Sequence, residues 1–381
     1  FGSPTGLMFY QGNRAIHQYM NTLIHADAGP RVIRSYRPMP NGAGYKADIR
    51  ILVSNDEDTW FRPSDVCAAP DGSIFISDWY DPGVGGHRMG DISRGRIYRL
   101  APKGQASVIP PLDLEKPDGF LMALNSPNQA RRYLAFAAWP HVNQEVRDAV
   151  RGEQNDQPSP SKEDGLYGHP LDGARAYWLA AYELRDGNVD GTLLPGRKYP
   201  DLQCEIVRRL AREAMPTIQK VLGPETASNP DPRVRRQLLL ELRKYNTQPW
   251  AKKPLMELAA QYDGSDRFYR EAIGIAFQGV ESWAFNEVIA RLGGTWDARL
   301  AGIVTQLHPP DALPLVKSAL ADKKLDVALH MHALEALDAI GTQDAGQQIV
   351  AVLTTDAPPE LKSHALHLLA RDGGDAWRGV T

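Results

Sequence analysis

The sequence predicts a β + α multidomain protein in which the C-terminal blades of a β-propeller are followed by a HEAT-type α-solenoid. Three observations predict this class. The chain has 381 residues, more than one compact domain usually holds. Residues 1–115 contain short β-type runs, whereas the apolar residues of 116–381 follow a helical period. Helix starts also recur at residues 231, 266, 296, 325 and 359, which is 29 to 35 residues apart.

Two groups of short runs, rich in β-branched and aromatic residues, are the evidence for strands. The first group comprises residues 6–10, 22–25, 32–36 and 49–53, and the second comprises 64–68, 73–77, 95–100 and 106–109. Turn signals such as Pro70-Asp71-Gly72 separate the runs. Two successive groups of four strands are typical of the last two blades of a propeller, and a β-sandwich is the alternative. Two blades cannot close a ring, and the chain opens on Phe1 without a methionine, so we expect a fragment of a longer protein with further blades upstream.

The helical half is predicted to consist of paired helices. The recurring starts carry an acidic residue at or beside their first position, where it can cap the first turn and oppose the helix dipole: Asp231, Asp266, Asp297, Asp326 and Glu360. A second helix follows four of them, at residues 254–262, 282–292, 312–320 and 347–353. The polar stretch at about 151–168 is interpreted as a surface loop within this half.

Composition excludes several classes of protein. Apolar residues make up 43% and charged residues 23%, with a net charge of −3, which argues against disorder and against an electrostatic attraction to nucleic acid. No apolar run reaches the ~18–20 residues of a transmembrane span. The two cysteines exclude a disulfide framework and any CxxC metal site, although their spacing leaves one disulfide open. Cys67 lies on an apolar strand and is interpreted as a core thiol.

Three polar segments are predicted to gather on one face of the propeller, at the mouth of its channel: residues 25–31, 55–62 and 78–91. Their arginines suit carboxylates or phosphates, and their histidines could transfer a proton. The predicted cofactor-binding residues are His25, Arg31, Arg62, His87 and Arg88. Asp78 and Asp81 are predicted to bind a hard cation. The alternative is that these residues only build turns and ion pairs between blades.

The helical half offers no comparable chemistry. His364 and His367 are three residues apart and share a helix face, but they lack an acidic third ligand for a metal. Because a solenoid usually presents an extended binding surface, we expect this half to contact a protein partner.

The run from Phe61 to Asp81, its continuation through Gly85-Gly86-His87-Arg88 and residues 94–99, and the segment 23–31 resemble a known family. They are similar to the large bacterial membrane-bound dehydrogenase-like proteins. Those carry a propeller similar to the glucose/sorbosone quinoprotein dehydrogenases, then HEAT-like repeats, and commonly a c-type cytochrome domain. The similarity covers about residues 1–115 specifically and the later domain order more loosely.

The resemblance implies part of a quinoprotein-type dehydrogenase that oxidises a sugar or other alcohol and passes electrons to a c-type haem. It implies pyrroloquinoline quinone and Ca²⁺ as cofactors, a c-type cytochrome as a partner, and a periplasmic or cell-envelope location. The histidine base of those enzymes comes from an earlier blade, so no catalytic residue is assigned here. The alternative is a non-catalytic propeller and HEAT scaffold in a cell-envelope complex.

Overall fold

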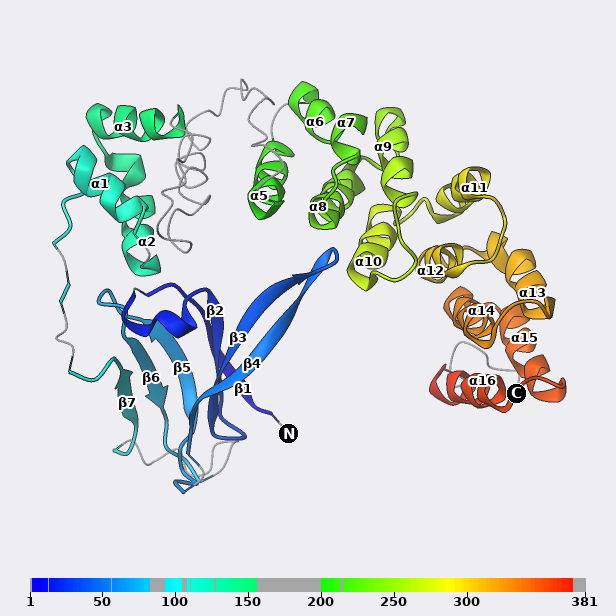
Figure 1. The fold of residues 1–381 in the computed structure, drawn as a ribbon, viewed down its shortest axis with the longest axis horizontal. Coiled ribbons are helices and arrows are strands. Elements are labelled where there is room, and N and C mark those ends of the chain that lie inside the picture. Colours follow the sequence, from blue (N-terminus) through cyan, green and yellow to red (C-terminus); the bar gives the residue numbers. More distant parts are fainter. Residues whose placement is uncertain are drawn as a thin grey trace. The chain divides into compact units, whose positions relative to one another are not determined.

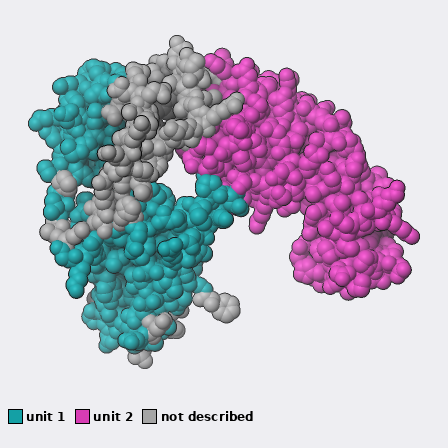
Figure 2. Space-filling view, in the orientation of Figure 1, with its two compact units in different colours: residues 1–41, 45–186 teal, residues 42–44, 187–381 magenta. Residues whose placement is uncertain are grey.

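The computed structural model describes residues 2–12, 14–55, 57–82, 93–104, 108–109, 111–126, 128–155, 200–212 and 215–372. The chain divides into two compact units, which Figure 2 distinguishes by colour. The first comprises residues 1–41 and 45–186, and the second comprises residues 42–44 and 187–381. The predicted order, antiparallel sheets followed by stacked helices, is confirmed.

The first sheet is a four-stranded antiparallel meander in the order β1-β2-β3-β4 (Figure 1). Its strands are β1 (Pro4–Tyr10), β2 (Thr22–Asp27), β3 (Val32–Asn41) and β4 (Gly44–Ser54). A 3₁₀ segment, η1 (Arg14–Tyr19), connects β1 to β2. All four predicted strands of the first group are therefore present, and β3 and β4 extend further than their apolar runs indicated.

The second sheet has three strands in the order β5-β6-β7: β5 (Pro63–Ala68), β6 (Ile74–Asp78) and β7 (Arg96–Leu100). They correspond to the first three runs of the second group. The fourth run, 106–109, is not a strand where the structure describes it, at Val108 and Ile109, and its first two residues lie outside the described part.

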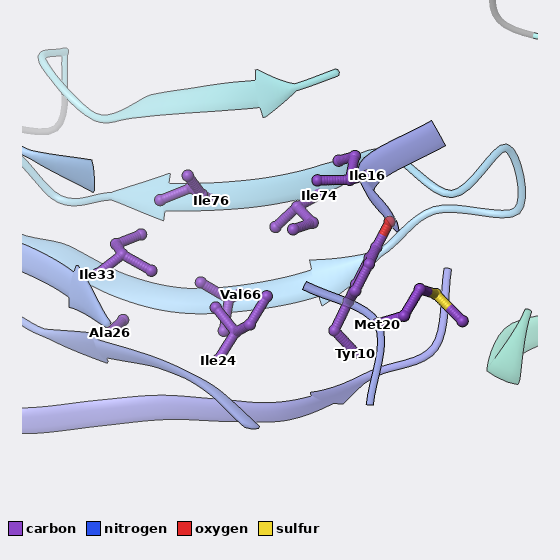
Figure 3. Packing of buried hydrophobic residues seen from close by; sticks show 9 residues of the cluster. All are labelled: Tyr10, Ile16, Met20, Ile24, Ala26, Ile33, Val66, Ile74 and Ile76. Atoms are coloured by element: carbon purple, nitrogen blue, oxygen red, sulfur yellow. The ribbon is translucent and has the colours of Figure 1, made fainter. Parts of the chain in front are cut away.

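The two sheets pack face to face, and alternation along the strands decides which side chains meet between them. Ile24 and Ala26 of β2 point inward with Val66 of β5, and Ile74 and Ile76 of β6 lie beside them (Figure 3). Tyr10 closes one end of this core, where its hydroxyl donates a 2.5 Å hydrogen bond to the carbonyl of Gly72. Side chains at the intervening positions face away from this core.

A small helical cluster completes the first unit. It comprises α1 (Pro117–Leu124), α2 (Gln129–Ala138), η2 (Trp139–His141) and α3 (Gln144–Asn155). Asn128 caps α2 by accepting from the backbone N–H groups of Ala130 and Arg131. Its side-chain amide also donates to the carbonyl of Ala69 at 2.8 Å, which ties the helix start to the second sheet.

The second unit is a stack of helices. Its elements are α5 (Pro200–Leu210), α6 (Met215–Val221), α7 (Pro224–Ala227), α8 (Pro232–Leu242), η4 (Arg243–Tyr245), α9 (Pro249–Ala259), α10 (Arg267–Ala276), α11 (Glu281–Leu292), α12 (Ala298–Leu307), η5 (Pro310–Ala312), α13 (Leu313–Ala321), α14 (Val327–Ile340), α15 (Gln343–Thr354) and α16 (Pro359–Asp372). Helices α5, α8, α10, α12, α14 and α16 contact one another in succession. The second helices lie between them in the chain, and α9 contacts both α8 and α11.

The repeated helix starts are confirmed in detail. Asp231, Asp266, Asp297 and Asp326 are the N-caps of α8, α10, α12 and α14, and each carboxylate accepts a backbone N–H of the first turn. The expected start of α9 at Pro254 is wrong, because Pro249 occupies the first turn and Pro254 lies inside the helix. Among the described residues, no helix has the length and apolar character needed to cross a membrane.

Candidate anion-binding site

Two arginines from neighbouring sheets come together at one end of the strands. Arg31 lies in the turn between β2 and β3, and Arg62 directly precedes β5. Asp78 is the last residue of β6 and pairs with Pro63, the first residue of β5. The sequence therefore predicted correctly that these turns share one end of the sheets. The structure brings Arg31, Arg62, Asp78 and Asp81 close enough for their charges to act on one another.

Asp78 anchors the turn that follows β6. Its Oδ1 accepts the backbone N–H of Arg62 at 2.8 Å and that of Tyr80 at 2.9 Å. These bonds hold Tyr80 in the left-handed region, at φ 52°. Asp78 is only 2% exposed, and its second oxygen, Oδ2, is buried without a hydrogen-bond partner. A buried carboxylate oxygen without a donor is costly, so this position is unusual for a residue that only builds a turn.

Arg62 is the more buried of the two arginines, with 5% of its surface exposed. Its guanidinium donates from Nη1 to the carbonyl of Phe61 at 2.9 Å and from Nη2 to that of Pro82 at 3.0 Å. Its Nε is buried and has no partner. Burial lowers the pKa of Arg62, the charge of Arg31 lowers it further, and the nearby carboxylates of Asp81, Asp78 and Asp58 raise it. Neutral carbonyls leave the charge of Arg62 only partly compensated.

Arg31 adds a second positive charge in a strained backbone position. Its φ is 59°, in the left-handed region that arginine rarely adopts. Its Nε is also buried without a hydrogen-bond partner. Two guanidinium groups near each other, each with an unused donor, suit an anion with several oxygen atoms.

An aromatic and cationic group borders this cluster. The rings of Trp60 and Tyr80 lie 5.6 Å apart between centroids, and the guanidinium of Arg96 lies 3.4 Å above the Tyr80 ring. Arg96 also forms a 3.4 Å ion pair with Asp58. Arg96 was not among the residues predicted from the sequence. The signal was the spacing of Arg96 and Tyr98, which are two residues apart in β7 and therefore lie on one face of the strand.

His25 does not join the arginines. It pairs in register with Leu7 on β1 and Arg34 on β3, and it lies between the inward-facing Ile24 and Ala26. It therefore faces the other side of the sheet, where the hydroxyl of Tyr36 lies 3.4 Å from its Nδ1. His87 and Arg88 lie outside the described residues, so their predicted roles remain predictions.

The predicted cation site also remains a prediction. Within the described ranges, no three His, Cys, Asp or Glu side chains gather closely enough to hold a metal ion. Asp78 uses Oδ1 to accept two backbone N–H groups, which leaves Oδ2 as its free ligand atom. A cation at Asp78 and Asp81 would need ligands from elsewhere.

Both cysteines are free thiols. Cys204 is buried in α5, and burial raises its pKa to about 11. The interpretation of Cys67 as a core thiol is wrong, because it is exposed. It alternates with Val66 and Ala68, whose side chains pack toward the core, so its own side chain points outward.

One known family matches part of this chain. Residues 1–104 match a family described as a domain of unknown function, DUF7133. No curated protein matches the chain. Among solved structures, an engineered protein is 17% identical over 52% of this chain and 98% of its own, with a TM-score of 0.26. The matched family ends just after β7, so it contains the two sheets and the arginine cluster.

Proposed function

We propose that residues 1–104 form two successive blades of a β-propeller, and that Arg31 and Arg62 belong to a site for a carboxylate-bearing cofactor at its channel mouth. The observation that carries the proposal is the pair of like charges, each with a buried Nε that lacks a partner. Separating such charges from water is unfavourable unless an anion compensates them. The resemblance to quinoprotein dehydrogenases gives this anion a chemical identity.

Pyrroloquinoline quinone fits these residues in part. It is a planar quinone with carboxylate groups, and Arg31 and Arg62 would hold those carboxylates through forked hydrogen bonds. When bound, it supplies the two-electron acceptor needed to oxidise a sugar or another alcohol. The chain's own contribution is binding and orientation. Ca²⁺ would take Asp78 Oδ2 together with ligands from outside the described residues, and the c-type haem would belong to another part of the protein.

The experiment is a dye-reduction assay on the protein that contains this chain, reconstituted with the quinone and Ca²⁺ and supplied with sugars and simple alcohols. We expect turnover that Arg31→Gln reduces at least about tenfold, since one charge-assisted bidentate contact is worth about 1.5–3 kcal/mol. Arg50→Gln is the matched control, because Arg50 is an exposed arginine of β4 paired with Asp48. Turnover without quinone dependence, or no turnover at all, would remove the enzyme proposal.

A scaffold is the second candidate, and the stacked helices of the second unit favour it. Helix pairs at intervals of 29 to 35 residues fit HEAT-type repeats, whose common use is an extended binding surface for proteins. In this alternative both units serve a cell-envelope complex without catalysis. A folded protein that shows no quinone binding by calorimetry would support the scaffold, whereas saturable binding would count against it.

A further inference from the structure

A polar pocket lies among three successive helices of the second unit, α10, α12 and α14, which are neighbours in Figure 1. Its volume is about 240 Å³, several times the ~30 Å³ that a water molecule occupies in the liquid. The pocket is therefore large enough for a small polar group with part of its backbone. The polar side chains that line it are Tyr262, Ser265, Arg270, Thr305, His332 and Glu335.

Arg270 supplies the positive charge of this pocket. Its Nε is buried and lacks a hydrogen-bond partner. Its positive charge lowers the pKa of the buried Tyr262 phenol, although burial has the larger effect and raises it overall. Within the described ranges no carboxylate forms an ion pair with Arg270, whereas Arg267, on the same helix, pairs with Glu271 at 2.7 Å. A guanidinium in this position is prepared to bind an anion.

The space beside Arg270 depends on a glycine. A Cβ atom added at Gly302 of α12 would lie 2.8 Å from the hydroxyl oxygen of Tyr262. A side chain there would displace the phenol. Glycine in the middle of a helix costs about 0.5–1 kcal/mol relative to alanine, so it is an unfavourable choice unless the close approach is needed.

The opposite wall of the pocket accepts hydrogen bonds. Glu335 and His332 lie three residues apart on one face of α14, and His332 Nδ1 is buried without a partner. The Thr305 hydroxyl donates to the carbonyl of Ala301 at 2.9 Å, so its oxygen is left as an acceptor. An occupant must therefore offer acceptors to Arg270 and donors to Glu335. A carboxylate side chain with its neighbouring backbone N–H groups meets both requirements.

We propose that this pocket binds an acidic side chain of a partner polypeptide, with Arg270 holding the carboxylate and Glu335 accepting a backbone N–H. The proposal rests on the binding role given above to the helical unit and is independent of the quinone site. It assigns one part of the extended surface, the pocket at Arg270, to one acidic side chain of the partner. A small free carboxylate could bind Arg270 in the same way, so the test compares acetate with peptides.

The experiment follows the Nε–H resonances of ¹⁵N-arginine-labelled protein during titration. The probes are acetate, a blocked Gly-Asp-Gly tripeptide and a blocked Gly-Asn-Gly tripeptide. We expect a saturable shift of the Arg270 resonance with the aspartate peptide, at least about tenfold weaker binding of the asparagine peptide, and intermediate binding of acetate. Arg267 reports non-specific ionic effects in the same spectrum, so the result does not depend on a variant that folds.

Two outcomes would overturn the proposal. One is an equal, unsaturated shift of Arg267 and Arg270 with every probe. The other is equal affinity for the aspartate and asparagine peptides. Arg270→Gln should abolish the saturable binding and Arg267→Gln should preserve it. Acetate binding as tight as the aspartate peptide would assign the pocket to a small carboxylate and overturn the peptide anchor. None of these outcomes bears on quinone binding in the first unit.

Discussion

Two buried arginines, Arg233 of the helical unit and Arg62 of the sheet unit, have different hydrogen-bond partners. Arg233 of α8 is 8% exposed, and it pairs with Asp201 at 3.0 Å and with Asp231 at 2.9 Å. Arg62 is 5% exposed and donates only to two backbone carbonyls. The two arginines are buried to a similar extent, so burial alone does not distinguish them. Direct pairing with carboxylates suits an arginine that stabilises the fold, whereas the partners of Arg62 are consistent with the ligand site proposed above.

Aspartates show the same division. The four N-caps of α8, α10, α12 and α14 each accept a backbone N–H close to the helix surface. Asp78 also accepts two N–H groups, but its second oxygen is buried beside Arg62 without a donor. Each cap accepts an N–H from the first turn of its own helix. Asp78, at the end of β6, accepts the N–H of Arg62, the residue that precedes β5. We therefore expect substitutions in the two units to differ in how much they destabilise the protein and in how far the loss of amide protection spreads.

The largest expected contrast is between the two thiols. With the pKa of Cys204 raised to about 11 by burial, only about a thousandth of it is thiolate at pH 8, and it is shielded as well. Cys67 is exposed, so iodoacetamide should label it at least about a hundredfold faster. Mass spectrometry of the peptides measures both rates. Comparable rates would show that α5 opens readily.

The same shift predicts a pH dependence. The folded thiol of Cys204 has a higher pKa than the unfolded one, which ionises first as the pH rises. Stability of the helical unit is therefore unaffected below about pH 9 and falls as the pH rises from there towards 11. Urea unfolding of Cys204→Ser across this range should lose that component of the decline. If stability declines with pH equally in Cys204→Ser and in the unaltered protein, this prediction is contradicted.

Asp78→Ala should have the next largest effect. It leaves the backbone N–H groups of Arg62 and Tyr80 without an acceptor, at a cost of about 2–4 kcal/mol. Hydrogen exchange of those two amides measures the effect locally, without assuming that both units unfold together. Asp48→Ala is the control, because Asp48 makes only an exposed pair with Arg50. Equal protection in both variants would mean that Asp78 does not anchor the turn.

Asp326→Ala should cost less, about 1 kcal/mol, because it removes one cap hydrogen bond at 2.8 Å to the N–H of Leu329. Loss of amide protection should be confined to the first turn of α14. Thr342→Ala at the start of α15 is a comparable cap variant in the same unit. Loss of protection across several helices would contradict a purely local role.

Local signals explain what the sequence predicted well. An acidic cap followed by an apolar stripe specifies a helix start within one turn, and Asp231, Asp266, Asp297 and Asp326 were all identified this way. The strands were found for a similar reason, since turn residues mark their ends. The end of the sheets shared by Arg31 and Arg62 followed from the connectivity of two adjacent meanders.

Two side chains, those of His25 and Cys67, face the opposite side of their sheet from the one predicted, because side chains alternate between the two faces along a strand. His25 lies between Ile24 and Ala26, and Cys67 lies between Val66 and Ala68, so each must face away from the core that its neighbours build. The parity was readable in the sequence. The pocket at Arg270 was not, because its walls come from α10, α12 and α14, and no pattern in one helix shows which side chains face across to the next.

Direct titration of pyrroloquinoline quinone into the protein tests the central claim, that Arg31 and Arg62 are held together for a carboxylate-bearing ligand. Calorimetry should show saturable binding to the unaltered protein, weakened about 10- to 100-fold by Arg31→Gln, or about 1.4–2.7 kcal/mol, and unchanged by Arg50→Gln. Identical affinity in all three proteins, or no binding to any of them, would contradict the account.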